Sequence, residues 1–466
     1  MIARTFRCAW MAALVMVAAC TVGPQYRRPE FTSPPQYKEI KGWKQAAPDI
    51  RTRESKWWES FRDQGLNALE EQVDDANPSL AQAVAQFEQA QAVTRGARAG
   101  LFPTFGISAS ADRAKSATGH SLVVPGITDL FAASGVVSWE PDVWGRVRRG
   151  IEADAASAVA SADDLRALRL SLHAQLAQNY FQIWALRAQQ RLLDETVTAY
   201  AKTLEITRNR LAVGIAAKAD VLQAQTQLDA TRATAIDLDA QQATLEHAIA
   251  LLLGKAPAEF SLPSLPALVI PPAVLAGVPS ELLERRPDIA AAERRVAAAN
   301  AQIGVATAAW FPTLTLAASG GSQTTAFPDL FATATRFWAL GPASLALTLF
   351  DGGARSAQIA AARAAHTAAA AAYRGTVLAS FGEVENSLVT LRVLSEERMA
   401  QDAAAHAARE SLTLTVNQYR AGTVSYLNVI TAQALALNNQ STAIGLRGQQ
   451  LVTTVLLIKA IGGGAQ

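Results

Sequence analysis

The sequence predicts a mainly helical chain that also contributes four short amphipathic strands, arranged as two tandem repeats. Long segments without proline predict unusually long helices. Short segments in which apolar and polar residues alternate predict strands. Several motifs recur at a nearly constant spacing, so we expect the same structural unit to be built twice.

The N-terminus has the features of a secretory signal, predicted over residues 1–19. Two arginines precede the apolar run Met11–Ala19, which is too short to remain as a membrane span. The segment Val17–Cys20 (VAAC) resembles a bacterial lipobox, in which the cysteine becomes the first mature residue and carries diacylglycerol and an N-acyl chain such as palmitate. The alternative is an ordinary signal peptide with a chance cysteine. By resemblance, Thr21 in place of aspartate favours the outer membrane.

The cysteine content and the net charge argue against a disulfide-stabilised protein and against a nucleic-acid-binding protein. The second cysteine, Cys8, lies in the signal, so we expect a mature chain without disulfides. The formal net charge is +2, and no basic patch indicates a nucleic-acid partner. The first mature segment, residues 20–77, is predicted to be a lipidated arm followed by an equatorial segment.

Two pairs of long helices are predicted, each pair interrupted by one glycine. The helical segments are Ile151–Val213, Ile215–Leu253, Ala354–Ala421 and Thr423–Ile461. Gly214 and Gly422 lie at the interruptions, where glycine can adopt the positive φ that ends a helix. Part of the first helix has the spacing of a coiled-coil seam. Its residues are Leu186, Gln190, Leu193, Val197, Tyr200, Leu204, Thr207 and Leu211.

Four alternating segments precede the long helices. They are Pro103–Asp112, Ala133–Asp142, Pro312–Ser319 and Ala343–Asp351. Each is close to the length of about 9–11 residues that a tilted strand needs to cross a bilayer. Aromatic residues gather near their ends, as in an interfacial girdle. A small soluble sheet with one buried face is the alternative. Asp142 and Asp351 lie where strands give way to helices, so we expect them to cap those helices.

The two halves align as tandem repeats. At a spacing of 209 residues, Pro78 matches Pro287, Phe102 matches Phe311 and Asp142 matches Asp351. The predicted organisation is a signal (1–19), an arm and equatorial segment (20–77), repeat 1 (78–254), a proline-rich linker (255–286) and repeat 2 (287–466). Each repeat contains a helix, two strands and a long helical hairpin.

Four strands cannot close a barrel, and open sheet edges are not tolerated in lipid. Since the smallest bacterial barrels have about eight strands, several copies of the chain must join. Periodicity alone leaves two or three copies open.

The ordered motifs resemble those of the TolC-type outer-membrane efflux factors, in the OprM-like, NodT-type lipoprotein branch. The motifs are the lipobox followed by TVGPQYRRPE, the paired LFPT and WFPT, DVWGR, FDGGAR and YRAGTVSYLNV. The resemblance implies a trimer with a twelve-stranded β-barrel in the outer membrane, continued by a twelve-helix α-barrel in the periplasm. It also implies a passive exit duct for small molecules, fed by a periplasmic adaptor and an inner-membrane transporter of the RND type.

The resemblance assigns roles to the hairpin turns. Gly214, Gly422 and Thr423 correspond to periplasmic tips that contact the adaptor, although a purely structural role for these turns is the alternative. Tyr419 and Asp220 match a gate network of the family. Where some relatives carry acidic or basic gate residues, this chain has Asn428, Thr431 and Val424. We therefore expect closure by apolar packing and hydrogen bonds, with Asp220, Leu412, Val416, Tyr419 and Asn428 as gate candidates.

No enzyme motif stands out. The five histidines lack metal-ligand spacing, and there is no zinc-protease, nucleophile-elbow or dinucleotide-binding motif. Neither a metal nor another cofactor is expected. Two alternatives remain: a periplasmic adaptor, which would have a single hairpin, and a structural coiled-coil lipoprotein, which would lack amphipathic strands.

Overall fold

The computed structural model describes most of the chain. It covers residues 21–39, 56–115, 127–263, 265–266, 269–272, 279 and 285–463. The predicted signal and the predicted acylation site, Cys20, lie outside the described residues. By compactness the chain divides into two units. Unit 1 draws on residues up to Glu30, Gln86–Ala162 and Ala291–Arg374, and unit 2 on Phe31–Ala85, Asp163–Ala290 and Gly375–Gln466. Both units therefore contain residues from each predicted repeat.

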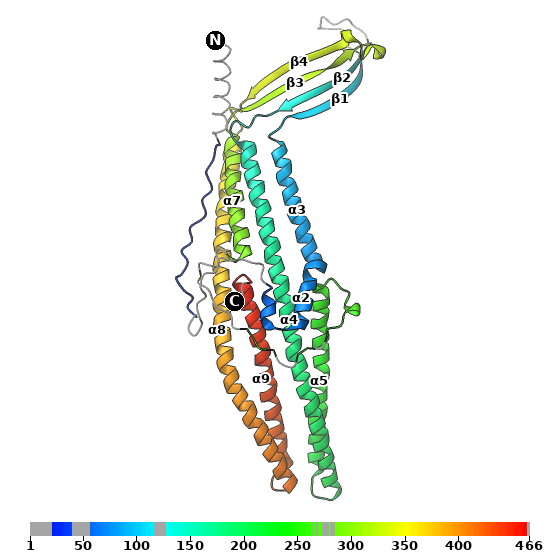
Figure 1. Ribbon diagram of the computed structural model, residues 1–466, viewed down its shortest axis with the longest axis vertical. Coiled ribbons are helices and arrows are strands. Elements are labelled where there is room, and N and C mark those ends of the chain that lie inside the picture. Colours follow the sequence, from blue (N-terminus) through cyan, green and yellow to red (C-terminus); the bar gives the residue numbers. More distant parts are fainter. Residues whose placement is uncertain are drawn as a thin grey trace. The chain divides into compact units, whose positions relative to one another are not determined.

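Helices dominate the structure (Figure 1). In chain order the helical elements are η1 (Trp57–Phe61), α2 (Gln64–Ala76), α3 (Pro78–Ala99), α4 (Arg146–Ala212), α5 (Lys218–Leu252), η2 (Pro257–Glu259), α7 (Pro287–Ala308), η3 (Phe327–Asp329), η4 (Thr333–Thr335), α8 (Ala354–Ala421) and α9 (Tyr426–Ala460). The α8 bounds coincide with the predicted segment. Helix α4 begins earlier than predicted and includes Gly150. Within the described residues, no helix combines the length and apolarity needed to span a bilayer.

Aspartates cap both long helices that follow strands, as predicted. The Asp142 carboxylate accepts from the amides of Val147 and Arg148, at 3.0 and 2.9 Å. The Asp351 carboxylate accepts from the Arg355 amide at 3.1 Å and from its guanidinium. A negative charge at this position satisfies free amides and complements the helix dipole.

The four strands of unit 1 form one antiparallel sheet. They are β1 (Thr104–Lys115), β2 (Ile127–Trp139), β3 (Thr313–Thr324) and β4 (Arg336–Ala346), in the order β1-β2-β3-β4. The β2–β3 pairing joins the two repeats. Strand β4 runs several residues earlier than the predicted Ala343–Asp351. The Gly341–Pro342 pair, which reads as a break in the sequence, lies inside the strand, and the ladder ends at the Thr313–Ala346 pair.

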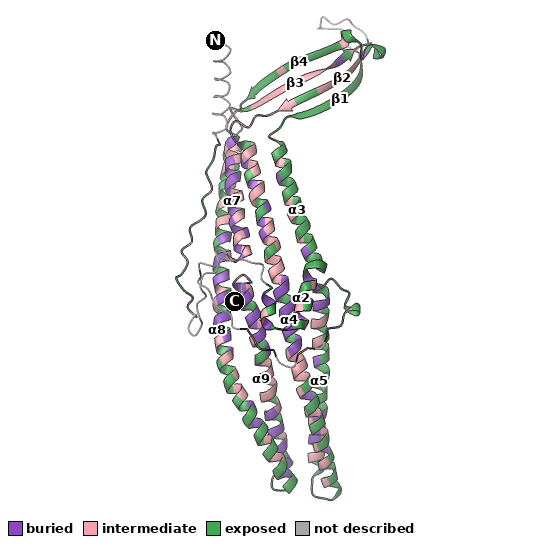
Figure 2. Cartoon of the chain, viewed as in Figure 1, coloured by how far each residue is buried: buried purple, intermediate pink, exposed green. Residues whose placement is uncertain are grey.

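The two faces of the sheet differ in polarity, as the alternation predicts. Paired residues share a face. Phe105 pairs with Val137, and Ile107 with Gly135 on the apolar face. On the other face Ser108 pairs with Ser134, and their hydroxyls lie 3.0 Å apart. The apolar face is solvent-exposed in the single chain, with Ile107 80% exposed. Figure 2 shows that the residues of β1 and β4 are mainly exposed, whereas those of β2 and β3 are mostly intermediate.

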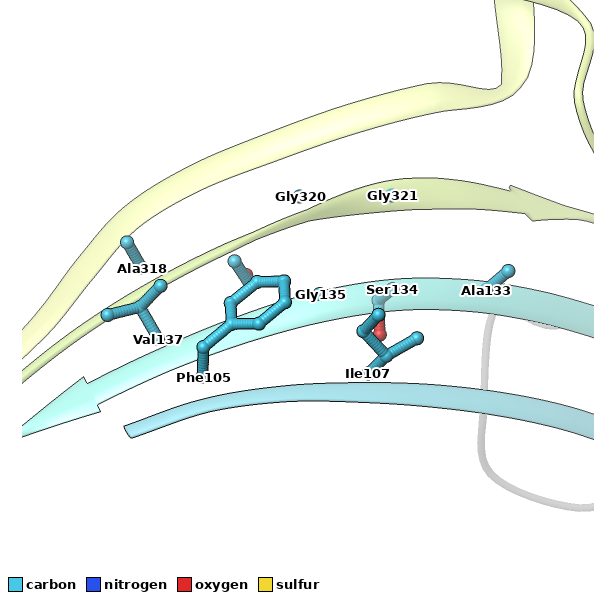
Figure 3. Close-up of a pocket in the computed structure, with 10 residues that line it drawn as sticks. Phe105, Ile107, Ala133, Ser134, Gly135, Val137, Ala318, Gly320 and Gly321 are labelled. Carbon is cyan, nitrogen blue, oxygen red and sulfur yellow. The ribbon is translucent and has the colours of Figure 1, made fainter. Parts of the chain in front are cut away.

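A shallow cavity of about 550 Å³ lies on this apolar face (Figure 3). It forms where glycines leave the sheet without side chains: Gly135 pairs with Gly320 across β2 and β3. The Phe105 ring borders it, because a Cβ on Gly135 would lie 3.2 Å from Phe105 Cε2. The ring covers backbone that glycine would otherwise leave bare.

Unit 2 buries the equatorial segment against α4. The His173 imidazole lies 2.7 Å from the Glu70 carboxylate and stacks on Trp58 with a centroid distance of 4.5 Å. Burial raises the pKa of Glu70 to about 7, although its bond to His173 opposes the shift. His173 thus has a structural role, and the described residues contain no cluster with the composition of a metal site.

Candidate functional site

The candidate site comprises the two helical turns of unit 2, α4–α5 and α8–α9. In both, the glycine has positive φ: +77° at Gly214 and +78° at Gly422. The Gly214 amide donates to Leu211 O at 2.9 Å, and the Ile215 amide to Arg210 O at 2.8 Å. Gly422 and Thr423 repeat this pair of bonds at 3.0 Å each. Both helices therefore end in the same Schellman motif, which only glycine adopts without strain.

A hydrophobic cluster behind the turns draws on all four helices. We call it the tip cluster. Its buried members are Tyr200, Leu204, Ala224, Leu228, Tyr419, Tyr426 and Val429. The α4 residues among them, Tyr200 and Leu204, belong to the predicted coiled-coil pattern. The Tyr419 and Tyr426 rings lie 5.5 Å apart. The last residue of that coiled-coil pattern, Leu211, remains 36% exposed, because α4 ends one residue later and the cluster packs against the helical turn before Leu211.

Tyr419 connects the two hairpins. Its side chain is 5% exposed, and its hydroxyl lies 3.4 Å from Thr207 Oγ1 on α4. Arg210 Nη1 donates to Tyr419 O at 2.5 Å, and the guanidinium lies 4.5 Å from the ring centroid. The cation therefore contacts both the face of an aromatic ring and a carbonyl at the C-terminal end of α8, which also accepts from the Gly422 amide.

Sequence reasoning missed Arg210. A basic residue in the last turn of a helix is common, because it complements the helix dipole locally. Only the fold brings this one to the other hairpin. The available signal was an asymmetry between the repeats: Arg210 corresponds to Gln418, while Leu211 corresponds to Tyr419.

Asp220 lies beside this contact and makes a different bond. Its carboxylate accepts from the Ala217 amide at 3.1 Å, at the start of α5. Asp220, Arg210 and Tyr419 line one cavity of about 460 Å³, together with residues of both turns. Burial raises the pKa of Tyr426 to about 12, with the neighbouring Tyr419, Tyr200 and Asp220 adding to the shift. The Tyr426 phenol therefore remains protonated near neutral pH.

The other predicted site residues occupy less central positions. Val416 packs against the tip cluster, and Leu412 is half-buried one turn away. Asn428 is exposed near the start of α9. The Thr423 hydroxyl donates to Gln418 O at 3.0 Å and is exposed, as are Gly214 and Gly422.

The chain is similar to outer-membrane proteins of efflux pumps along nearly its whole length. The family described as outer membrane efflux protein matches residues 69–255 and 278–463. The toluene efflux pump outer membrane protein TtgC of Pseudomonas putida is 31% identical over 458 residues, covering 96% of this chain and 93% of TtgC. The outer membrane protein OprJ of Pseudomonas aeruginosa is also 31% identical, covering 96% of this chain and 94% of OprJ.

The fold is also that of a known channel. The solved outer-membrane channel OprN superposes with a TM-score of 0.89 at 31% identity, covering 96% of this chain and 99% of OprN. These similarities exclude the adaptor and the coiled-coil lipoprotein. The chain belongs to the outer membrane efflux protein family and is a non-enzymatic outer-membrane channel of an efflux pump.

Proposed function

We propose that three copies of this chain form a passive exit duct. The observation that supports this most strongly is the sheet, in which the described strands β1 and β4 each have a neighbour on one side only. Open edges are costly in lipid, and the exposed apolar face on this sheet suits a bilayer. Four strands in each of three copies give twelve, and β1 of one copy would pair with β4 of the next.

The edge pairing can be tested with engineered disulfides. The sequence contains Cys8 and Cys20 only, so cysteines introduced along β1 and β4 would report on the new contact cleanly. Oxidation should yield covalent trimers from the outer-membrane fraction when the two positions face each other, and single substitutions should not. A purified mature protein that is monomeric and gives no conductance in planar bilayers would contradict the proposal.

The duct receives small molecules from an inner-membrane pump, of the RND type, through a periplasmic adaptor. The exposed glycine turns, with Gly214, Gly422 and Thr423, are the proposed adaptor contact. TtgC is named for toluene efflux, so small organic molecules are the first cargo to test. A photoreactive residue at Thr423 should cross-link the adaptor in cells, whereas one at the lipid-facing Ile107 should not.

The Cys20 thiol is the proposed site of acylation. The lipobox-like VAAC segment supports it, and the acyl chains would add membrane affinity to that of the strands. Mass spectrometry of the purified mature chain should find a tri-acylated N-terminal cysteine. A free α-amino group at another residue would instead indicate ordinary signal cleavage.

The tip cluster is the proposed gate. The contacts that would hold it closed are intramolecular: Arg210 and Thr207 of one hairpin contact Tyr419 of the other. While these contacts hold, the α8–α9 turn cannot swing away from the α4–α5 turn. Opening then requires loss of the Arg210 contact with Tyr419, and an adaptor docked on the turns is positioned to provide it.

A further inference from the structure

The first described residues, 21–30, form a strap on the surface of unit 1. The Val22 amide donates to Trp144 O at 3.2 Å, just before α4 begins. Arg149, in the first turn of α4, donates to Val22 O at 3.3 Å and to Gly23 O at 3.4 Å. The strap is therefore bonded through its backbone to the start of α4.

The same strap also contacts α7. The Gly23 backbone lies directly on α7, since a Cβ at Gly23 would come 2.5 Å from Gly304 Cα. Asn300 donates to Pro24 O at 3.1 Å. The Tyr26 hydroxyl donates to the Glu293 carboxylate, and burial together with this bond raises the pKa of Tyr26.

The side chains that bond the strap are themselves buried in unit 1. Arg149, Glu293 and Asn300 are 6%, 6% and 5% exposed. A buried polar group without a partner is destabilising, and each of these three bonds the strap. Arg149 also pairs with Glu152 at 2.7 Å, and Glu293 with Arg294 at 2.6 Å. A segment that only connected the membrane to the rest of the chain would not need bonds to buried side chains.

The position of the strap gives these contacts a role. Helix α4 follows β2 and α7 precedes β3, so both helix ends lie next to the strand pair that joins the two repeats. Trp144 stacks on Phe311 at 4.8 Å and donates to Pro312 O at 2.7 Å at the same junction. We call the β2–β3 pairing the seam.

We propose that the strap is a clamp: it ties the first turn of α4 to α7 and thereby keeps the seam between the repeats closed. The hairpins β1–β2 and β3–β4 are continuous in sequence and hold their own register. The seam pairs strands separated by the long hairpin of repeat 1, so it gains most from a fastening beside it.

The test is residue-resolved hydrogen exchange of the full mature channel in detergent. In Arg149→Met, amides bonded across the seam should exchange about tenfold faster or more, since bonds from a charged donor are lost. Amides bonded within the two hairpins should keep their wild-type rates. The matched control is Arg146→Met, which removes an exposed guanidinium from the same turn of α4, paired at 2.9 Å with Glu140.

Two outcomes would overturn the proposal. In the first, the Val22 amide exchanges freely in Arg149→Met while the seam amides stay protected, which would show that the strap does not stabilise the seam. In the second, seam and hairpin amides accelerate equally, so the strap stabilises unit 1 without acting on the seam. If Arg149→Met does not fold, Tyr26→Phe decides the question. It leaves α4 intact and should accelerate seam amides selectively, by a smaller factor.

Discussion

The two hairpin turns share one backbone geometry and differ in their side chains. Both end in a Schellman motif with glycine φ near +78°. The α4–α5 turn carries the donor, Arg210, and its Leu211 is partly exposed. The α8–α9 turn carries the acceptor, Tyr419, which is buried at the position corresponding to Leu211. The repeat therefore explains the shared geometry of the turns. The differences at two positions, Arg210/Gln418 and Leu211/Tyr419, allow one hairpin to bind the other.

Tyr419→Ala should produce the largest effect. It removes a buried ring from the tip cluster and should cost about 3–5 kcal/mol of local stability at the tip. We expect a raised closed-state leak in planar bilayers. Leu211→Ala, at the corresponding position of the other hairpin, should change the leak little, because that side chain is partly exposed. An unchanged leak in Tyr419→Ala would show that the gate assignment is wrong.

Arg210→Gln should come next. It gives the first turn the residue that the second turn has at Gln418, and it removes both the bond to Tyr419 O and the contact with the ring. The loss should be about 1.5–3 kcal/mol, measured as faster hydrogen exchange of the α8–α9 turn. Gln418→Ala is the reciprocal control and should leave that exchange unchanged. Equal effects of the two substitutions would remove the asymmetry between the turns.

Gly214→Ala and Gly422→Ala test the shared geometry. Both residues have positive φ, so each alanine should cost about 1–2 kcal/mol through backbone strain. Because the cost arises from the backbone, the two values should agree closely in the exchange of their own turns. Gly445→Ala, inside α9 with only the flexible end of Gln189 nearby, is the matched control and should be neutral or stabilising. A large difference between the two turns would mean that side-chain contacts, rather than φ, require one of the glycines.

Asp220→Asn should have the smallest effect. It gives the first turn the residue found at Asn428 in the second, and the amide oxygen can still accept from Ala217 N. Only the interaction of the charge with the α5 dipole is lost, worth about 0.3–1 kcal/mol. The leak should stay near that of the wild type. A leak as large as that of Tyr419→Ala would indicate that the charge of Asp220 takes part in closure.

The elements were predictable because their signals are local. Freedom from proline identified the helices, alternation identified the strands, and Gly214 and Gly422 identified the turns. The bounds of β2 and β4 were not. Strand β2 begins at Ile127 rather than Ala133, and β4 includes Gly341–Pro342 at a register shift, where the sequence indicates a break. Contacts between repeats also escaped prediction. Nothing in the sequence near Arg210 indicates Tyr419, and nothing near Gly23 indicates Gly304.

The sequence by itself determined the repeat, the helix lengths, the polarity of each strand face and the positions of the turns. All of these depend on propensities and periodicities of neighbouring residues. The tertiary structure alone decided which residues from the two repeats meet: Arg210 with Tyr419 at the tip, and the strap with Arg149 and Gly304 beside the seam. Those pairings lie far apart along the chain, so they depend on packing in three dimensions and leave no periodic trace in the sequence.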